Sequence, residues 1–221
     1  MSSAPLPAGI EAPAFDRSFR ETLRELFTWR RDVRVFQRSP LPKGCLERLI
    51  DLACLAPSVG LSEPWRFVIV EDASRRAEIR ACFEACNALA LEAQEPGRAS
   101  LYARLKLAGL DDAPCQLAVF ADLSTCQGHS LGRQTMPEMI AYSAVLAIHT
   151  LWLAARAEGI GIGWVSILDP LRIASILDAP TSWKLIGYLC IGYPTAEDPT
   201  PALERQGWEE RRGASAVVFR R

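Results

Sequence analysis

The sequence predicts an α+β fold of three layers, in which helices flank one central sheet. Three observations support this class: apolar residues recur at helical spacing in several segments, short apolar runs typical of strands lie between them, and the connections differ widely in length. The chain has 221 residues, of which 49% are hydrophobic and 23% charged. That size and composition allow one substantial core and argue against global disorder.

The first part of the chain is predicted to hold two helices and a strand. Apolar residues recur every three or four positions over 19–30 and again over 43–56, which indicates two amphipathic helices. The second must end at Pro57, because the residue before a proline is pushed out of the helical region. The loop SVGLSEPW then leads into a strand over 67–70.

The middle of the chain is also predicted to contain helices and a strand. An alanine- and glutamate-rich segment over 73–93 predicts a helix, which the sequence Glu-Pro-Gly interrupts. A further helix is expected over 100–107 and a strand over 117–121. The irregular, polar stretch 123–137 is a candidate active-site loop.

The last part contains the most apolar helix. Pro137 opens it, since proline is well tolerated in a first helical turn, and it extends to residue 158. A glycine-rich strand, GIGIGWVSIL, follows over 159–168. A short helix is expected over 171–177 and a strand over 184–193.

The ends of the chain are expected to behave differently from the domain. Residues 1–18 are predicted to form a flexible arm before one domain over 19–221. The tail over 194–221 is long for a compact domain, so we expect it to wrap a partner subunit before a last strand at 217–219. Because one monomer cannot easily cover the apolar helix 137–158, a large homodimer interface is also expected.

Composition excludes several classes of protein. The formal net charge of −1 lacks the basic excess of a nucleic-acid-binding protein. Seven cysteines without a CxxC pair, and only two histidines, predict no metal site and reduced thiols, hence a cytoplasmic protein. The N-terminus lacks the features of a signal peptide. The longest uncharged run, 140–155, is shorter than the roughly 20 residues that a bilayer requires, so no membrane span is expected.

The stretch RRDVR is the first candidate site. It places Arg30, Arg31 and Arg34 around a single carboxylate, Asp32. Guanidinium groups match phosphate and carboxylate oxygens, so the stretch suits an anionic ligand with an acid beside it. The alternative is a helix C-terminus where cations complement the helix dipole and Asp32 only screens them.

Two loops are weaker candidates. In APSVGLSEPW, Pro57 stiffens the chain and Ser58 offers a hydroxyl, although an ordinary helix-to-strand turn would look the same. In GIGIGWVSI, alternating glycines remove side chains from one side of the strand. Either a planar ligand or another element of the protein can then approach the backbone closely. The pattern is not GxGxxG, and a Walker A motif is also absent.

Taken together, RRDVR, APSVGLSEPWRFV, LWLAARAEGIGIGWVSI and LCIGY resemble the flavin-dependent nitroreductase superfamily, in order from about residue 29 to 208. More closely, the chain resembles the 5,6-dimethylbenzimidazole synthases, which fragment reduced FMN with oxygen. Asp32 within RRDVR, coupled to WVSI, is the most specific feature, since ordinary nitroreductases usually carry serine at that place. The resemblance implies a nitroreductase-like fold with a central mixed sheet and a C-terminal extension exchanged in a dimer.

The resemblance also implies residue roles. Asp32 and Ser166 would be catalytic, by moving protons at the flavin. Arg30 and Arg211 would bind the FMN phosphate, and Arg34 would face the pyrimidine side of the isoalloxazine. The full cofactor-binding set implied is Arg30, Arg31, Asp32, Val33, Arg34, Pro57, Ser58, Leu107, Val165, Ser166, Gly192 and Arg211.

The implied reaction converts FMNH2 and O2 into 5,6-dimethylbenzimidazole, the lower ligand of cobalamin, and erythrose 4-phosphate. NADH or NADPH would be the reductant, acting directly or through a separate flavin reductase. Two alternatives remain open at this point: an NAD(P)H-dependent FMN nitroreductase or flavin reductase, and a non-catalytic FMN-binding protein. The presence of Asp32 favours the fragmentation of reduced FMN over the nitroreductase activity.

Overall fold

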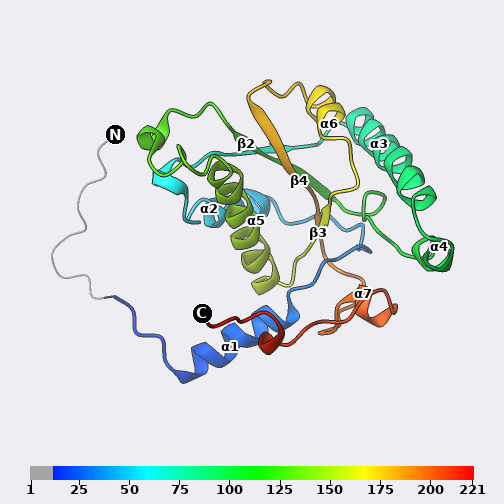
Figure 1. The fold of residues 1–221 in the computed structure, drawn as a ribbon, viewed down its shortest axis with the longest axis horizontal. Helices are drawn as coiled ribbons and strands as arrows, with labels where there is room; N and C mark the ends of the chain where they lie inside the picture. The colour runs from blue at the N-terminus through cyan, green and yellow to red at the C-terminus, as the bar shows by residue number, and fades with distance from the viewer. Residues whose placement is uncertain (1–11) are drawn as a thin grey trace.

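The computed structural model describes residues 12–221 as a sheet with helices on both faces (Figure 1). Most of the arm predicted over 1–18 lies outside the described residues, and its last two positions belong to the first helix. The helices are α1 (Arg17–Trp29), α2 (Cys45–Ala53), α3 (Ala73–Glu92), α4 (Pro96–Tyr102), α5 (Met139–Ala157), α6 (Pro170–Ile176) and α7 (Ala202–Arg205). The strands are β1 (Trp65–Ile69), β2 (Cys115–Asp122), β3 (Gly161–Val165) and β4 (Trp183–Gly192).

The four strands form one sheet in the order β1-β2-β4-β3, and every neighbouring pair is antiparallel. The expectation of a mixed sheet was therefore wrong for these strands. The connection between β3 and β4 covers residues 166–182, which is long enough for a parallel crossover as well as for an antiparallel return, so the packing of the strands, and not the length of the connection, sets the direction here. Within residues 12–221, the one parallel pairing is an isolated bridge between Asp32 and Ile162.

The predicted three layers are confirmed. Helix α5 packs on the sheet together with α2, and the fully buried Leu49, Ile148 and Leu151 belong to this layer of the core. Helices α3 and α6 cover the other face, where Ile79 and Ile173 are fully buried. Each layer buries its apolar stripe against the sheet, as this architecture requires.

Helix α5 extends beyond the uncharged run that the sequence singled out. Within residues 12–221 it is the one helix that is long and apolar enough to cross a membrane. However, eight of its residues, including Ala144, Ile148 and Leu151, are buried against the sheet and α2. The apolar character of this helix is therefore accounted for in part by the core that it forms.

Two predicted elements differ from the structure. Helix α4 begins at Pro96 and ends at Tyr102, because the proline that was expected to interrupt the chain takes the first helical position instead. The strand expected at 217–219 is absent from the described chain. These residues follow a short 3₁₀ turn, Ala214–Ala216, and are 61–73% exposed, with no strand beside them to supply hydrogen bonds.

All seven cysteines lie in the described part of the chain and are free thiols. Burial in β4 raises the pKa of Cys190 to about 12. We expect Cys190 to resist iodoacetamide at about pH 8, since the thiolate is the nucleophile, whereas the exposed Cys126 is alkylated readily. Mass spectrometry of peptides from the folded and the denatured protein measures this difference. Equal labelling of Cys126 and Cys190 in the folded protein would contradict the buried position of β4.

Candidate functional site

The candidate site forms where the chain leaves α1 and runs along the free edge of β3. Helix α1 ends at Trp29, and Arg30 turns the backbone into an extended conformation. The backbone N–H of Val33 then donates to the carbonyl of Ile162, with an N···O distance of 3.0 Å. On the same edge, the backbone N–H of Trp164 donates to Oδ1 of Asp32 at 2.9 Å. The carboxylate of Asp32 thus satisfies a polar group of an edge strand.

The alternating glycines of β3 make this approach possible. A Cβ at Gly163 would lie 2.0 Å from the carbonyl oxygen of Val33, and one at Gly161 would lie 2.6 Å from Val33 Cγ2. Of the two explanations that the sequence left open for these glycines, close packing by another element of the protein is therefore correct here. The element is the segment that carries Asp32.

Arg34 fixes the other oxygen of Asp32. Its Nε donates to Asp32 Oδ2 at 2.7 Å, and its Nη1 donates to the carbonyl of Lys106 at 3.0 Å. The side chain of Arg34 is 16% exposed and that of Asp32 is 31% exposed. Partial burial and two well-placed partners give this charged pair a defined geometry.

The remaining arginines of the stretch are held apart from Asp32. Arg30 stacks over the ring of Trp152, with its Cζ 4.9 Å from the ring centroid. Arg31 donates to the carbonyl of Pro199. Arg30 is also the C-cap residue of α1, and Arg31 Nη1 donates to the Arg30 carbonyl at 2.6 Å, so these two cations lie at that helix end as well.

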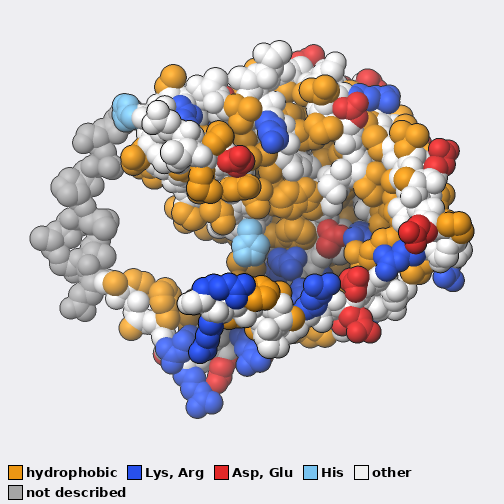
Figure 2. All heavy atoms as spheres, viewed as in Figure 1, with side chains coloured by type: hydrophobic (Ala, Val, Ile, Leu, Met, Phe, Trp, Pro, Cys, Tyr) orange, Lys and Arg blue, Asp and Glu red, His pale blue; other side chains and the backbone are white. Residues whose placement is uncertain are grey.

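Arg211 joins the same cluster from the C-terminal tail. With Arg30, Arg31, Asp32 and Arg34 it lines a cavity of about 130 Å³. Burial lowers the pKa of Arg30 and of Arg31, and the nearby charge of Arg211 lowers both further. Figure 2 shows basic side chains gathered in this region, around α1 and the end of the chain. Four guanidinium groups with one carboxylate form a strong site for an anion.

A second cavity, of about 200 Å³, adjoins the first and shares Arg31, Asp32 and Arg34. Its other walls are the end of α5, the beginning of β3 and the segment 194–206. Lys106 also lines it. Asp32 therefore borders two adjoining spaces.

Four other predicted residues surround this region. Val165 ends β3 and is buried, and Ser166 follows it and is exposed. Ser166 lies two residues beyond Trp164, about 7 Å along the strand from the N–H that binds Asp32. Gly192 pairs with Gly161 at the other end of β3. Leu107 is half-buried beside Lys106, whose carbonyl binds Arg34.

Pro57 and Ser58 do not join the site within one chain. The backbone N–H of Val59 donates to Ser143 Oγ near the beginning of α5, whereas the indole N–H of Trp152 donates to the carbonyl of Arg31 near its end. Nine residues of helix separate these two anchors, about 13.5 Å. Ser58 itself accepts a hydrogen bond from the N–H of Glu63, which closes its own loop.

Sequence reasoning missed the roles of two tryptophans and a lysine. Trp152 holds both Arg30 and Arg31, and Trp164 contributes its backbone N–H to Asp32. Lys106 contributes its carbonyl. A tryptophan near the end of a core helix, nine residues before a glycine-rich strand, was a usable signal. A backbone carbonyl in an irregular segment leaves no signature in the sequence.

The chain is similar to known proteins over most of its length. The nitroreductase family model matches residues 27–193. A 5,6-dimethylbenzimidazole synthase of Rhodospirillum rubrum is 56% identical over 200 residues, 90% of this chain and 95% of that protein. One from Rhodobacter capsulatus is 46% identical over 196 residues, 89% of this chain and 95% of that protein.

Solved structures show the same fold. An iodotyrosine deiodinase bound to FMN and 3-iodo-L-tyrosine superposes with a TM-score of 0.70 at 25% identity, over 90% of this chain and 97% of that one. A nitroreductase-like protein of Streptococcus mutans gives a TM-score of 0.67 at 17% identity, over 90% of this chain and 98% of that one. The chain belongs to the nitroreductase family and, within it, groups with the proteins named 5,6-dimethylbenzimidazole synthase.

Proposed function

We propose that this protein is an oxygen-dependent enzyme that fragments reduced FMN to 5,6-dimethylbenzimidazole and erythrose 4-phosphate. The observation that carries the proposal is Asp32, a carboxylate held between the Trp164 N–H and the Arg34 guanidinium beside a cluster of arginines. The 56% identity to a protein named for this product supports it.

The arginine cluster fits the phosphate of FMN. Arg30, Arg31 and Arg211 repel one another, and burial makes their charges still less favourable. A phosphate dianion would offset this repulsion and accept several charge-assisted hydrogen bonds. We assign Arg30 and Arg211 to the phosphate, with Arg31 beside them, and Arg34 with Val33 to the wall of the ring site.

Asp32 and Ser166 are the groups that we assign to proton movement. Reduced flavin, when bound, supplies both the electrons for O2 and the carbon atoms of the product. The carboxylate of Asp32 can accept or donate a proton next to that ring, and the exposed Ser166 hydroxyl can relay one. Val165, Gly192 and Leu107 are assigned to the packing around the ring.

The reductant is NADH or NADPH, acting directly or through a separate flavin reductase, and O2 is the co-substrate. We place the protein in the cytoplasm, which accords with its seven free thiols. The direct test is aerobic incubation of the purified protein with FMN, NADPH and a flavin reductase, followed by mass analysis. The benzimidazole is expected, and it should be lost in Ser166→Gly. Quantitative recovery of intact FMN would refute the proposal and favour a nitroreductase or a flavin-binding protein.

Arg211 provides a test of the phosphate assignment. We expect Arg211→Gln to weaken FMN binding at least about tenfold, because hydrogen bonds between charged groups each contribute about 1.5–3 kcal/mol. Riboflavin, which lacks the phosphate, serves as the matched ligand. Fluorescence titration should show little change in riboflavin affinity. An equal loss for both flavins would place the phosphate elsewhere.

We also propose a homodimer, because the assigned residues are divided between the two ends of α5. In a two-fold dimer whose α5 helices pair antiparallel, Pro57 and Ser58 of one subunit would approach the Asp32 site of the other. The outer face of α5 supports this arrangement: Tyr142, Val145 and Leu146 are 38–50% exposed. Figure 2 shows hydrophobic side chains gathered on the viewed face where Figure 1 has α5 and α2.

The oligomeric state of two leucine variants tests the dimer. Leu146→Glu is expected to give monomers with weakened FMN binding, since it introduces a charge into the α5 face. Leu171→Glu, at a leucine that is 82% exposed on α6, should remain dimeric. Sedimentation velocity distinguishes the two states. A dimeric Leu146→Glu variant would exclude this interface.

A further inference from the structure

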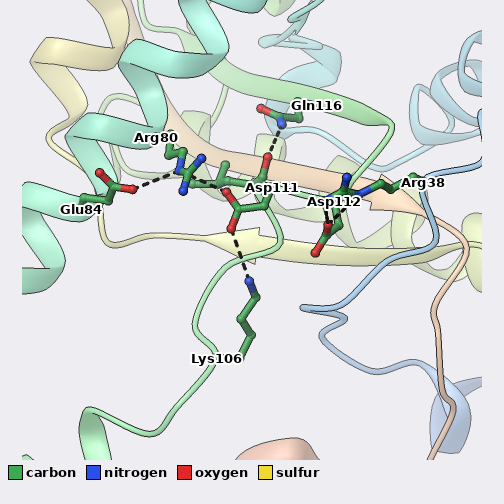
Figure 3. Close-up of polar contacts among 8 residues, drawn as sticks. Arg38, Arg80, Glu84, Lys106, Asp111, Asp112 and Gln116 are labelled. Carbon is green, nitrogen blue, oxygen red and sulfur yellow. Dashed lines mark hydrogen bonds and ion pairs between the residues drawn. The ribbon is translucent and has the colours of Figure 1, made fainter.

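Residues 103–114 connect α4 to β2 and pass the Asp32 site. The second half of this segment, 109–114, is fixed firmly to the sheet. Gln116 Nε2 donates to the carbonyl of Leu110 at 2.9 Å, and its Oε1 accepts from the hydroxyl of Tyr188 at 2.6 Å. Both nitrogens Nε and Nη2 of Arg38 donate to Asp112 Oδ1, at 3.0 and 2.9 Å (Figure 3). Gln116 is only 2% exposed, so this anchor is part of the core.

The first half of the segment touches the site directly. The carbonyl of Lys106 accepts from Arg34 Nη1 at 3.0 Å, while Nε of the same guanidinium binds Asp32 at 2.7 Å. The position of the Lys106 backbone therefore limits where Arg34 can lie. Through Arg34 it also limits the position of the Asp32 carboxylate.

Asp111 connects the two halves of the segment. Its Oδ1 lies 3.1 Å from Arg80 Nε on α3, and its Oδ2 lies 3.5 Å from Lys106 Nζ. Arg80 also pairs with Glu84 at 3.0 Å. Figure 3 shows these side chains in one row, with Lys106 reaching up from the first half of the segment to Asp111 on the second. Such a network holds a geometry better than an isolated exposed pair.

We propose that Asp111 is a positioning residue for Asp32, and that it acts through Lys106 and Arg34. The inference rests on the proposed function, because Asp32 is assigned there to proton movement. Asp111 stands on the firmly anchored half of the segment and draws Lys106 towards it. The Lys106 carbonyl then orients Arg34, which holds one oxygen of Asp32.

The consequence concerns how reduced flavin is used. If Arg34 is less well oriented, Asp32 is less often placed for its proton transfer, and the flavin reacts with O2 in the simpler way. In that reaction FMNH2 transfers two electrons and two protons to O2, which yields intact FMN and H2O2. Loss of Asp111 should therefore shift the products from benzimidazole towards intact FMN and peroxide.

Asp111→Asn removes the charge while keeping the size of the side chain. We expect kcat for benzimidazole to fall about twofold to fivefold, since exposed ion pairs bias a local equilibrium by a factor of that order. KM for reduced FMN should change less, and the share of flavin returned intact should rise. Asp111→Glu keeps the charge and should restore the wild-type product ratio.

A matched control is Asp178→Asn, which breaks a comparable exposed pair, 2.6 Å long, with Arg75 in the first turn of α3. It should leave the product ratio unchanged.

Lys106→Met retains the backbone carbonyl but lacks the ammonium group. Its effect should equal that of Asp111→Asn, and the double variant should be no worse than either single one. All of these variants are expected to melt within about 3 °C of the wild type.

Amide exchange gives a readout that does not depend on the reaction. The Trp164 N–H binds Asp32 Oδ1, so its exchange rate reports how well Asp32 is held. In flavin-free protein carrying isotope-labelled tryptophan, Asp111→Asn should speed the exchange of Trp164 several-fold, and Asp178→Asn should not. An unchanged Trp164 rate, or a wild-type product ratio in Asp111→Asn, would overturn the inference. A wild-type protein that makes no benzimidazole would instead refute the proposed function, while the exchange result would still stand.

Discussion

Asp32→Asn is expected to lower the rate of benzimidazole formation by a factor of about 100 or more, the usual contribution of a positioned acid or base. The replacement is nearly isosteric. Its carbonyl oxygen can still accept from the Trp164 N–H, which is 2.9 Å from Oδ1 in the wild type. Its amide group would face the Nε of Arg34, however, so that a donor meets a donor where a carboxylate oxygen now lies at 2.7 Å.

Two measurements separate a chemical effect from a structural one. Mass analysis of aerobic reactions should show intact FMN in place of the product. Flavin titration of the same variant should show binding within about tenfold of the wild type, because the phosphate assignment rests on Arg30 and Arg211. Normal product formation by Asp32→Asn would show that this carboxylate takes no part in the chemistry.

The helices and strands could be predicted largely from local pattern. The buried Leu49 lies on a segment whose apolar spacing indicated a helix, Ile79 on one rich in alanine and glutamate, and Ile148 on the long apolar run that Pro137 opens. Strand direction could not be predicted in the same way. The connection between β3 and β4, residues 166–182, is long enough for either direction, so the direction depends on how strands and helices from distant parts of the chain pack together.

The candidate site could be predicted where its side chains form an unusual local sequence, such as three arginines around one aspartate. The RRDVR stretch identified the cluster of Arg30, Asp32 and Arg34, which the structure brings together with the distant Arg211. The contacts that orient it involve backbone groups, such as the Trp164 N–H and the Lys106 carbonyl. Every residue carries those groups, so their roles depend on the tertiary fold alone.

Gly163→Ala is expected to destabilise the protein by about 3 kcal/mol or more, the upper range for overpacking a core. For a chain of this size that corresponds to a fall in Tm of about 10 °C. The added methyl group would lie 2.0 Å from the carbonyl oxygen of Val33. Backbone atoms cannot rotate away, so the segment carrying Asp32 has to leave the edge of β3. Benzimidazole formation should then fall with the stability, although no catalytic side chain has changed.

Substitutions at two other glycines, Gly161 and Gly97, show whether the loss of stability in Gly163→Ala comes from the backbone contact. Gly161→Ala places its methyl group 2.6 Å from Val33 Cγ2, a side-chain contact, so Val33→Ala should restore most of the lost stability. The same second substitution should not rescue Gly163→Ala, because the clash there involves the backbone. Gly97→Ala, with open space around its Cβ in α4, should be neutral or slightly stabilising. Thermal melts of the three single and two double variants measure these differences. Rescue of Gly163→Ala by Val33→Ala would show that side-chain crowding, rather than a backbone contact, requires glycine at this position.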